Sequence, residues 1–210
     1  MPSQPSGAVT AQLGNVLTFT ANNTPLKKFL GGLILKVLGW KCTVKVSPEM
    51  KHCVMVAAPH TTNWDFPIAI STFWVMGVDV KFFIKDNYTK GPLGFIFKAL
   101  GALGVDRSKA KNGLTDYAID RLKETNELVV LVPAEGTRKW VEKWRTGFYR
   151  IAMEANVPIS LGYLDYEKKE AGVADVFYPS GDFEKDMTYI QEVYRPIKGK
   201  NPENYNPRIF

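Results

Sequence analysis

A histidine and an aspartate stand five positions apart, directly after an apolar run. His60 and Asp65 follow residues 53–58, which have the composition of a strand buried on both faces. Ligands gather where strands end and loops begin in folds that alternate strands and helices. An imidazole can take a hydroxyl proton at neutral pH, and a carboxylate on its other ring nitrogen fixes the tautomer. The pair therefore predicts general-base catalysis, with His60 as the base and Asp65 as its partner.

A structural interpretation of the same residues stays open. Asp65 can serve as the N-cap of the next helix, with Pro67 in the first turn, and His60 can be an ordinary loop histidine. A His-x-x-x-x-Asp spacing also arises easily by chance. The other histidine, His52, has no acidic neighbour and is interpreted as a surface residue.

A second loop with polar chemistry follows another apolar run, residues 128–132. It holds Glu135, Gly136, Thr137 and Arg138 in succession. A guanidinium can hold a phosphate through two parallel hydrogen bonds, and glycine lets the backbone approach a ligand closely. Glu135 can order the arginine or bind an acceptor hydroxyl. The alternative is a turn with a Glu–Arg surface pair, worth at most about 1 kcal/mol.

Two further cations lie where predicted elements end. Lys85 ends a predicted strand, and Arg107 follows the apolar run at residues 100–105. Each alone can be an exposed charge. Together with Arg138 they indicate an anion pocket, because three cations at the ends of elements can converge on one ligand.

Apolar and amphipathic segments alternate along the chain and predict a single α/β domain. Strands are expected at residues 42–47, 53–58, 80–84, 128–132, 158–164 and 173–178, and helices at 66–76, 92–100, 112–125, 145–155 and 185–194. This alternation is typical of a mixed, largely parallel central sheet flanked by helices. We expect the main domain to span residues 42–195.

The ends of the chain differ from this domain. Residues 25–41 have apolar side chains at helical spacing with lysines off that stripe, as in a cationic amphipathic helix on a membrane surface. An ordinary helix packed on the core remains the alternative. Polar residues 1–24 predict a mobile arm, and residues 196–210, rich in Pro, Asn and Lys, predict an extended tail.

The overall composition narrows the class of protein. The net charge of +6 favours anionic partners, such as lipid surfaces, phosphorylated molecules or nucleic acid. Two histidines and two separated cysteines predict no metal site, and the cysteines are expected to be reduced core residues of a cytoplasmic protein. Apolar runs are too short to span a bilayer, so a protein of this kind would lie on a membrane.

Several motifs in order resemble the glycerolipid acyltransferase family. His60 and Asp65 match its His-x-x-x-x-Asp motif, and Glu135 to Arg138 match its Glu-Gly-Thr-Arg motif. Further matches are 81–85 (Lys-Phe-Phe-Ile-Lys), 101–107 (Gly-Ala-Leu-Gly-Val-Asp-Arg), 144–147 (Trp-Arg-Thr-Gly) and 157–159 (Val-Pro-Ile). The resemblance covers roughly residues 51–165 and implies that 42–195 is an acyltransferase domain.

The resemblance implies direct acyl transfer to a lysophospholipid, with 1-acylglycerol-3-phosphate as the expected acceptor. It implies acyl-CoA or acyl-carrier protein as the donor, no cofactor, no nucleic acid, and peripheral association with the cytoplasmic face of an anionic membrane. It also implies that Arg138, Lys85 and Arg107 face the acceptor phosphate. Pro133-Ala134 departs from the usual Phe-Pro before Glu-Gly. Acylation of another lysolipid, such as an amino-acid lipid, and non-catalytic lipid binding are the alternatives.

Overall fold

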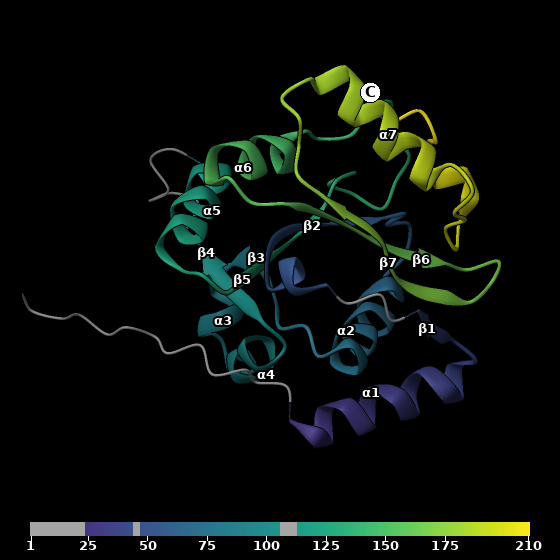
Figure 1. Ribbon diagram of the computed structural model, residues 1–210. Helices are drawn as coiled ribbons and strands as arrows, with labels where there is room; N and C mark the ends of the chain where they lie inside the picture. The colour runs from purple at the N-terminus through teal and green to yellow at the C-terminus, as the bar shows by residue number, and fades with distance from the viewer. Residues whose placement is uncertain (1–23, 44–46, 106–112) are drawn as a thin grey trace, which may run out of the picture.

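Seven strands form one sheet at the centre of the molecule (Figure 1). The computed structural model describes residues 24–43, 47–105 and 113–210. The strands in these ranges are β1 (Lys41–Thr43), β2 (His52–Ala58), β3 (Val80–Lys85), β4 (Ala102–Val105), β5 (Leu128–Pro133), β6 (Ile159–Asp165) and β7 (Glu170–Phe177). Their order is β1-β7-β6-β2-β5-β3-β4, which places β2, the strand before His60, at the centre.

The sheet is mixed and largely parallel, as predicted. Strands β6 and β7 pair antiparallel, and the other neighbouring pairs of described strands are parallel. Because β2, β5, β6 and β3 run in one direction, their carboxyl ends meet at a single edge of the sheet. That edge receives the loops that carry the predicted site.

Helices cover both faces of the sheet (Figure 1). One face carries α1 (Pro25–Leu38) and α2 (Asp65–Met76), and the other carries α5 (Gly113–Glu124), α6 (Gly147–Ala155) and α7 (Phe183–Tyr194). Between β3 and β4 the chain forms the short helices α3 (Asp86–Lys90) and α4 (Gly94–Ala99). Two 3-10 turns, η1 (Pro48–Lys51) and η2 (Pro202–Asn204), complete the described elements.

Strand β2 supplies side chains to the cores on both faces of the sheet. Val54 and Val56 pack with residues of α5, α6 and α7, whereas Cys53 and Met55 pack with residues of α2. All four are fully buried. Successive side chains of a strand point to opposite faces, so a strand covered on both sides is apolar throughout. This explains the unbroken apolar run before His60.

Two elements were not predicted from the sequence, β4 and α3. Strand β4 has four residues and contains Gly104, so it is too short and too interrupted to show a periodic pattern. Helix α3 has five residues, of which Thr89 is the buried one. They lie on either side of residues 92–100, for which the sequence analysis predicted a helix.

Helix α1 packs closely on α2 through a glycine. A Cβ atom at Gly31 would lie 2.6 Å from the Ser71 carbonyl oxygen, a distance that no side chain can occupy. Gly31 and Leu35 are the buried residues of α1. The helix begins after the N-cap Thr24, whose hydroxyl accepts the Lys27 N–H, and ends before Gly39. The predicted arm lies outside the described residues, apart from Thr24 itself.

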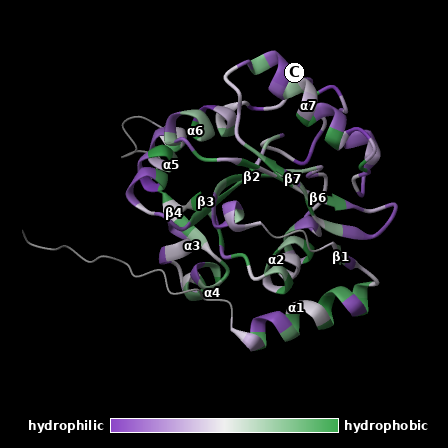
Figure 2. Cartoon of the chain, viewed as in Figure 1, coloured by the Kyte–Doolittle hydropathy of each residue, from purple (hydrophilic) through white to green (hydrophobic). Residues whose placement is uncertain are grey.

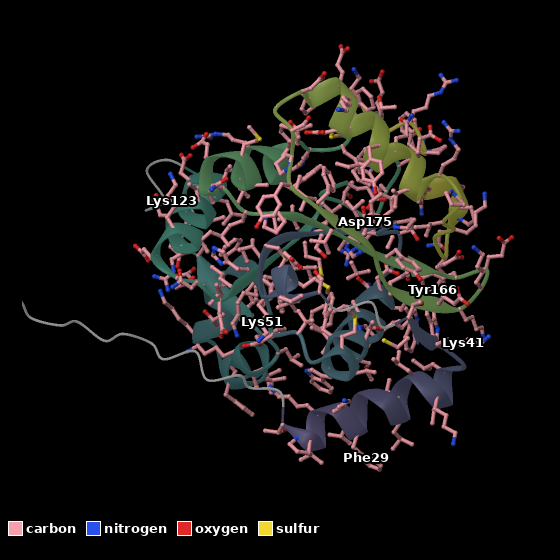
Figure 3. The ribbon with its side chains drawn as sticks, viewed as in Figure 1. Phe29, Lys41, Lys51, Lys123, Tyr166 and Asp175 are labelled. Carbon is pink, nitrogen blue, oxygen red and sulfur yellow. The ribbon has the colours of Figure 1, made fainter. Side chains whose placement is uncertain are left out.

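Helix α1 contains many hydrophobic residues (Figure 2), and most of them are exposed. We call this set the α1 stripe: Leu26, Phe29, Leu30, Leu33, Ile34 and Val37, all of them exposed. Phe29 points away from the sheet (Figure 3). In contrast, Trp40, just beyond the end of α1, is buried. None of the helices in the described ranges is long and apolar enough to cross a bilayer.

Strands β3 and β5 separate partway along the sheet. They pair at Val80–Val129 and Lys81–Val130, after which β3 pairs with β4 from Phe82 onward. The ladder of hydrogen bonds between β3 and β5 is therefore only two residues long. Beyond these two residue pairs, the side chains of β3 and β5 line an open space instead of packing against each other.

Candidate active site

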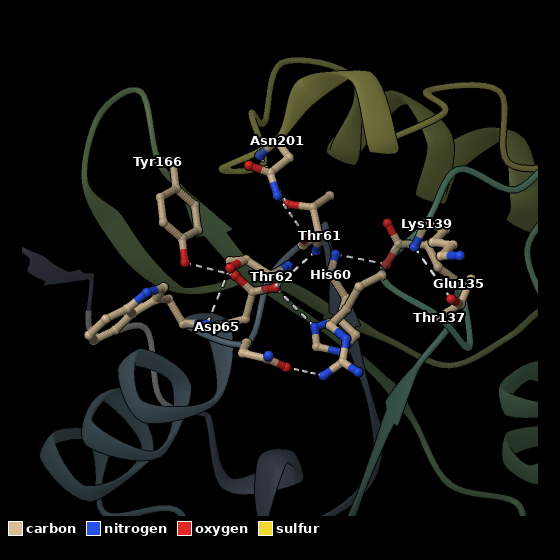
Figure 4. A network of polar contacts seen from close by, with 12 residues as sticks. His60, Thr61, Thr62, Asp65, Glu135, Thr137, Lys139, Tyr166 and Asn201 are labelled. Atoms are coloured by element: carbon tan, nitrogen blue, oxygen red, sulfur yellow. Dashed lines mark hydrogen bonds and ion pairs between the residues drawn. The ribbon is translucent and has the colours of Figure 1, made fainter.

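The carboxyl ends of three parallel strands bring together residues that lie far apart in the sequence. His60 follows β2, Glu135 follows β5 and Tyr166 follows β6. The strand order places β2 between β5 and β6. The three loops are therefore neighbours, and hydrogen bonds connect them (Figure 4).

His60 and Asp65 lie within hydrogen-bond distance. His60 Nδ1 is 3.0 Å from Asp65 Oδ2 (Figure 4). Because a carboxylate only accepts, a neutral His60 carries its proton on Nδ1 and keeps the lone pair on Nε2. The His60 side chain is 27% exposed and Asp65 only 6%, so the base is open to a ligand and its partner is not. This arrangement suits proton removal from a hydroxyl.

Asp65 also fixes the loop that carries the histidine. Its Oδ2 accepts the backbone N–H groups of Thr61 at 2.9 Å and Thr62 at 3.0 Å, and its Oδ1 accepts the Tyr166 hydroxyl at 2.8 Å. Asp65 is the first residue of α2, where a carboxylate also interacts favourably with the helix dipole. The capping interpretation is therefore wrong: Trp64 is the N-cap of α2 without a side-chain cap bond, and the Asp65 carboxylate binds the preceding loop and His60 instead.

Glu135 lies beneath the catalytic loop rather than beside Arg138. It is 3% exposed, and its Oε2 accepts the His60 backbone N–H at 2.8 Å. Burial raises the pKa of the Glu135 carboxyl from 4.5 to about 8, and the nearby Asp65 carboxylate adds to the rise. Glu135 therefore holds a proton at neutral pH and fixes the position of the His60 backbone.

The raised pKa of Glu135 predicts a pH-dependent stability. The contribution of Glu135 to the free energy of unfolding is fully present below pH 4.5 and is lost as the pH rises through 8. The reason is that the Glu135 carboxyl ionises at a lower pH in the unfolded chain than in the folded one. Between pH 5 and pH 8, we expect the free energy of unfolding of the wild type to fall more than that of Glu135→Gln. The difference between the two falls should be on the order of a few kcal/mol. Urea titrations at both pH values measure this, with the exposed Glu167→Gln as the control; parallel pH dependences of wild type and Glu135→Gln would contradict it.

The rest of the Glu135–Arg138 loop forms a compact turn. Arg138 donates a hydrogen bond to the Asn63 side-chain oxygen, and the Thr137 hydroxyl accepts the Lys139 N–H at 3.3 Å. Gly136 has φ of 68°, and a Cβ atom there would lie 2.7 Å from Arg145 Nε. The positive φ favours glycine here, and any larger side chain would also have to displace the Arg145 side chain.

The other predicted cations are Lys85 and Arg107. Lys85 ends β3 at the same edge of the sheet as His60, which is where its backbone was expected. Arg107 lies outside the described residues. Their roles, and those of Arg138 and Thr137, stay predictions.

A cavity of about 470 Å³ opens beside the dyad, in the space where β3 and β5 separate. Its walls are mostly apolar and include His60 and Asp65. Side chains from several elements line it, among them Ala69, Phe73, Phe82, Phe83, Leu131, Val132, Phe148 and Ile151. Within the described ranges, Arg145 is the single cation among its lining residues. Of the Glu135–Arg138 loop, only Gly136 reaches the cavity wall.

Sequence reasoning missed Tyr166 and Arg145 as site residues, and it misplaced His52. Tyr166 lies 101 positions from Asp65, so no local pattern signals the contact. Arg145 belongs to the Trp-Arg-Thr-Gly match, which signalled a family motif but no contact with Gly136. His52 is half-buried rather than on the surface, at the amino end of β2, and burial lowers its pKa.

The C-terminal segment, residues 196–210, lies against both loops of the site. Asn201 Nδ2 donates to the Thr61 carbonyl at 3.0 Å, and its backbone N–H donates to the Thr61 hydroxyl at 3.2 Å. Asn206 Nδ2 donates to the Glu142 carbonyl at 2.7 Å, in the connection from β5 to α6 that also holds Glu135. The segment predicted as an extended tail carries η2 and connects the two loops.

Two comparisons with known proteins agree with this geometry. The crystal structure of the 1-acyl-sn-glycerophosphate (LPA) acyltransferase, PlsC, from Thermotoga maritima has a similar fold, with a TM-score of 0.56 and 17% sequence identity over 82% of this chain and 77% of that one. Among curated protein sequences none matches. Residues 41–160, more than half of the chain, match the acyltransferase family model, which confirms the family predicted from the motifs. The chain belongs to the acyltransferase family.

Proposed function

We propose that the protein transfers a fatty acyl group from acyl-CoA or acyl-carrier protein to the free hydroxyl of 1-acylglycerol-3-phosphate, in phospholipid biosynthesis. The observation that supports this most is the dyad of His60 and Asp65 in the wall of an apolar cavity. An acceptor hydroxyl beside Nε2 and an acyl chain in the cavity would bring the two reacting groups together. The similarity to PlsC supports the fold on which this reaction is proposed to run.

The proposed reaction needs one base and no covalent enzyme intermediate. His60 Nε2 takes the proton of the acceptor hydroxyl while its oxygen attacks the thioester carbonyl carbon. Asp65 stabilises the imidazolium that forms. The tetrahedral intermediate then collapses, the C–S bond breaks, and the thiolate takes the proton back from His60. The products are the ester and the free thiol, and the imidazole is restored.

The apolar cavity is proposed to hold a fatty acyl chain. Its walls include Phe73, Phe82 and Leu131 from the core on the α2 face of the sheet and Phe148 from the core on the other face. Each methylene group buried there contributes about 0.8 kcal/mol to binding. A chain held between β3 and β5 could place its carbonyl end near His60, because His60 lines the same cavity.

Arg145 is proposed to bind the anionic headgroup of the acceptor. Its guanidinium has no hydrogen bond or ion pair to other residues in the described part of the chain, and it borders the cavity. We expect Arg145→Gln to raise KM for 1-acylglycerol-3-phosphate by about 10- to 100-fold, since a charged hydrogen bond is lost. Arg195→Gln is the control, because it removes the same charge from an exposed Arg195–Glu192 pair on the surface. Equal KM values for both variants would refute this contact.

The α1 stripe is proposed to lie on an anionic membrane surface. Its six apolar residues are exposed, and α4 continues them with exposed Phe95 and Ile96. Lys27 Nζ on α1 contacts the Ala99 carbonyl at the end of α4, so the two helices adjoin. Flotation with anionic vesicles tests this placement: the wild type should float and the Phe29→Glu/Val37→Glu variant should not. Equal flotation of both proteins would show that the α1 stripe does not bind the membrane surface.

A thiol-release assay tests the proposed function directly. Purified protein is mixed with acyl-CoA or acyl-carrier protein and with one acceptor from a panel: 1-acylglycerol-3-phosphate, other lysophospholipids and lyso-aminolipids. We expect fastest release with 1-acylglycerol-3-phosphate. Faster release with another lysolipid would change the proposed acceptor, and no release with any acceptor would favour a non-catalytic lipid-binding protein on this fold.

A further inference from the structure

The Asp65 carboxylate has a side-chain partner on each of its two oxygens. Oδ2 faces His60, and Oδ1 accepts the Tyr166 hydroxyl at 2.8 Å (Figure 4). A carboxylate with one bonded oxygen can still swing about its last torsion angle. With both oxygens bonded to groups from different loops, Asp65 has a single orientation toward the imidazole.

Tyr166 is itself held firmly. Its ring packs edge-on against Trp40, with centroids 4.8 Å apart, and its backbone N–H donates to the Lys198 carbonyl at 2.9 Å. Trp40 in turn is fixed by its own N–H, which donates to the Leu35 carbonyl at the end of α1. Burial and the Asp65 carboxylate raise the pKa of the Tyr166 phenol above 10, so the hydroxyl remains a donor.

We propose that Tyr166 is a positioning residue for the catalytic dyad. It acts through Asp65 and not on the substrate, since the cavity is lined by Asp65 and His60 but not by Tyr166. The inference rests on the proposed function, in which His60 is the base. Because Trp40 packs against the Tyr166 ring and Lys198 binds its backbone N–H, the orientation of Asp65 depends on how α1 and the C-terminal segment pack at this edge of the sheet.

The test is Tyr166→Phe, which keeps the ring against Trp40 and removes only the hydroxyl. We expect kcat for acyl transfer to fall about tenfold or more with little change in KM, as is typical when an outer partner of a catalytic group is lost. Tyr189→Phe is the matched control, because Tyr189 donates to Asp175 on the exposed surface and should leave kcat unchanged. An unchanged kcat in Tyr166→Phe would overturn the proposal.

A second measurement separates this proposal from the proposed function. The chain has two histidines, so imidazole nitrogen NMR with His52→Gln as the assignment variant reports on His60 alone. We expect the wild type to hold the proton on Nδ1 and Tyr166→Phe to show a mixture of tautomers. If Tyr166→Phe shows the mixture but the wild type has no turnover, the positioning role of Tyr166 is supported and the proposed reaction is rejected. If the two spectra are identical and the wild type turns over normally, only the positioning role is rejected.

Discussion

His60→Ala is expected to lower kcat by about 10²–10⁴-fold while the protein still binds lipid. The variant removes the base that takes the acceptor proton, and general-base catalysis contributes a factor of this size. The apolar walls of the cavity and Arg145 remain, so KM should change little. Thiol release under saturating donor and acceptor measures kcat, and vesicle flotation measures lipid binding.

His52 provides the matched control for this variant. It lies at the amino end of β2, whereas His60 follows the carboxyl end, so the two imidazoles stand at opposite edges of the sheet. His52→Ala should keep its kcat in the folded protein. Turnover of His60→Ala at the wild-type rate would reject the mechanism, whatever the acceptor.

Asp65→Asn is expected to lower kcat by about 10³–10⁴-fold, with folding largely preserved. An amide oxygen in the place of Oδ2 still accepts from Thr61, Thr62 and His60, but the neutral amide no longer stabilises the imidazolium. If the amide turns over, its NH2 group faces His60 and favours the wrong tautomer, with the proton on Nε2. Single-turnover thiol release and the unfolding midpoint, measured on the same preparation, separate the catalytic effect from the structural one.

Asp186 supplies the comparison for Asp65. It is also a buried carboxylate with several hydrogen bonds, to the Tyr149 hydroxyl and to Ser180, but it lies outside the cavity. Asp186→Asn should shift the unfolding midpoint and leave kcat of the folded protein intact. Comparable kcat losses in both variants would mean that Asp65 acts through stability alone.

The central features of the fold could be predicted from the sequence because each of them has a local sequence pattern. The apolar run of β2 and the spacing of His60 and Asp65 were both readable within a few residues. The burial of Glu135 and its bond to the His60 backbone were not readable, because they depend on β5 pairing beside β2. The exposure of the α1 stripe likewise depends on Gly31 being the point of contact with α2.

The tryptophans near the Glu135–Arg138 loop show the same limit. Trp140 and Trp144 have the same residue type, four positions apart, and the sequence allowed either membrane anchoring or packing for both. Trp144 is buried and packs edge-on against Tyr194, whereas Trp140 is 55% exposed. Tyr194 lies on α7, far along the chain, so only the assembled fold distinguishes the two.

Residues 196–210 give this enzyme an inactivation route that does not require unfolding. Asn201 and Asn206 attach the same short peptide to two loops, one with the base and one with the glutamate beneath it. A protease that trims the peptide would release both loops at once and would remove Ile197 and Ile209 from the core beneath α7, while the strands of the sheet stay paired. Such a nicked protein should melt at a lower temperature and turn over slowly; a nicked protein with full turnover would contradict this.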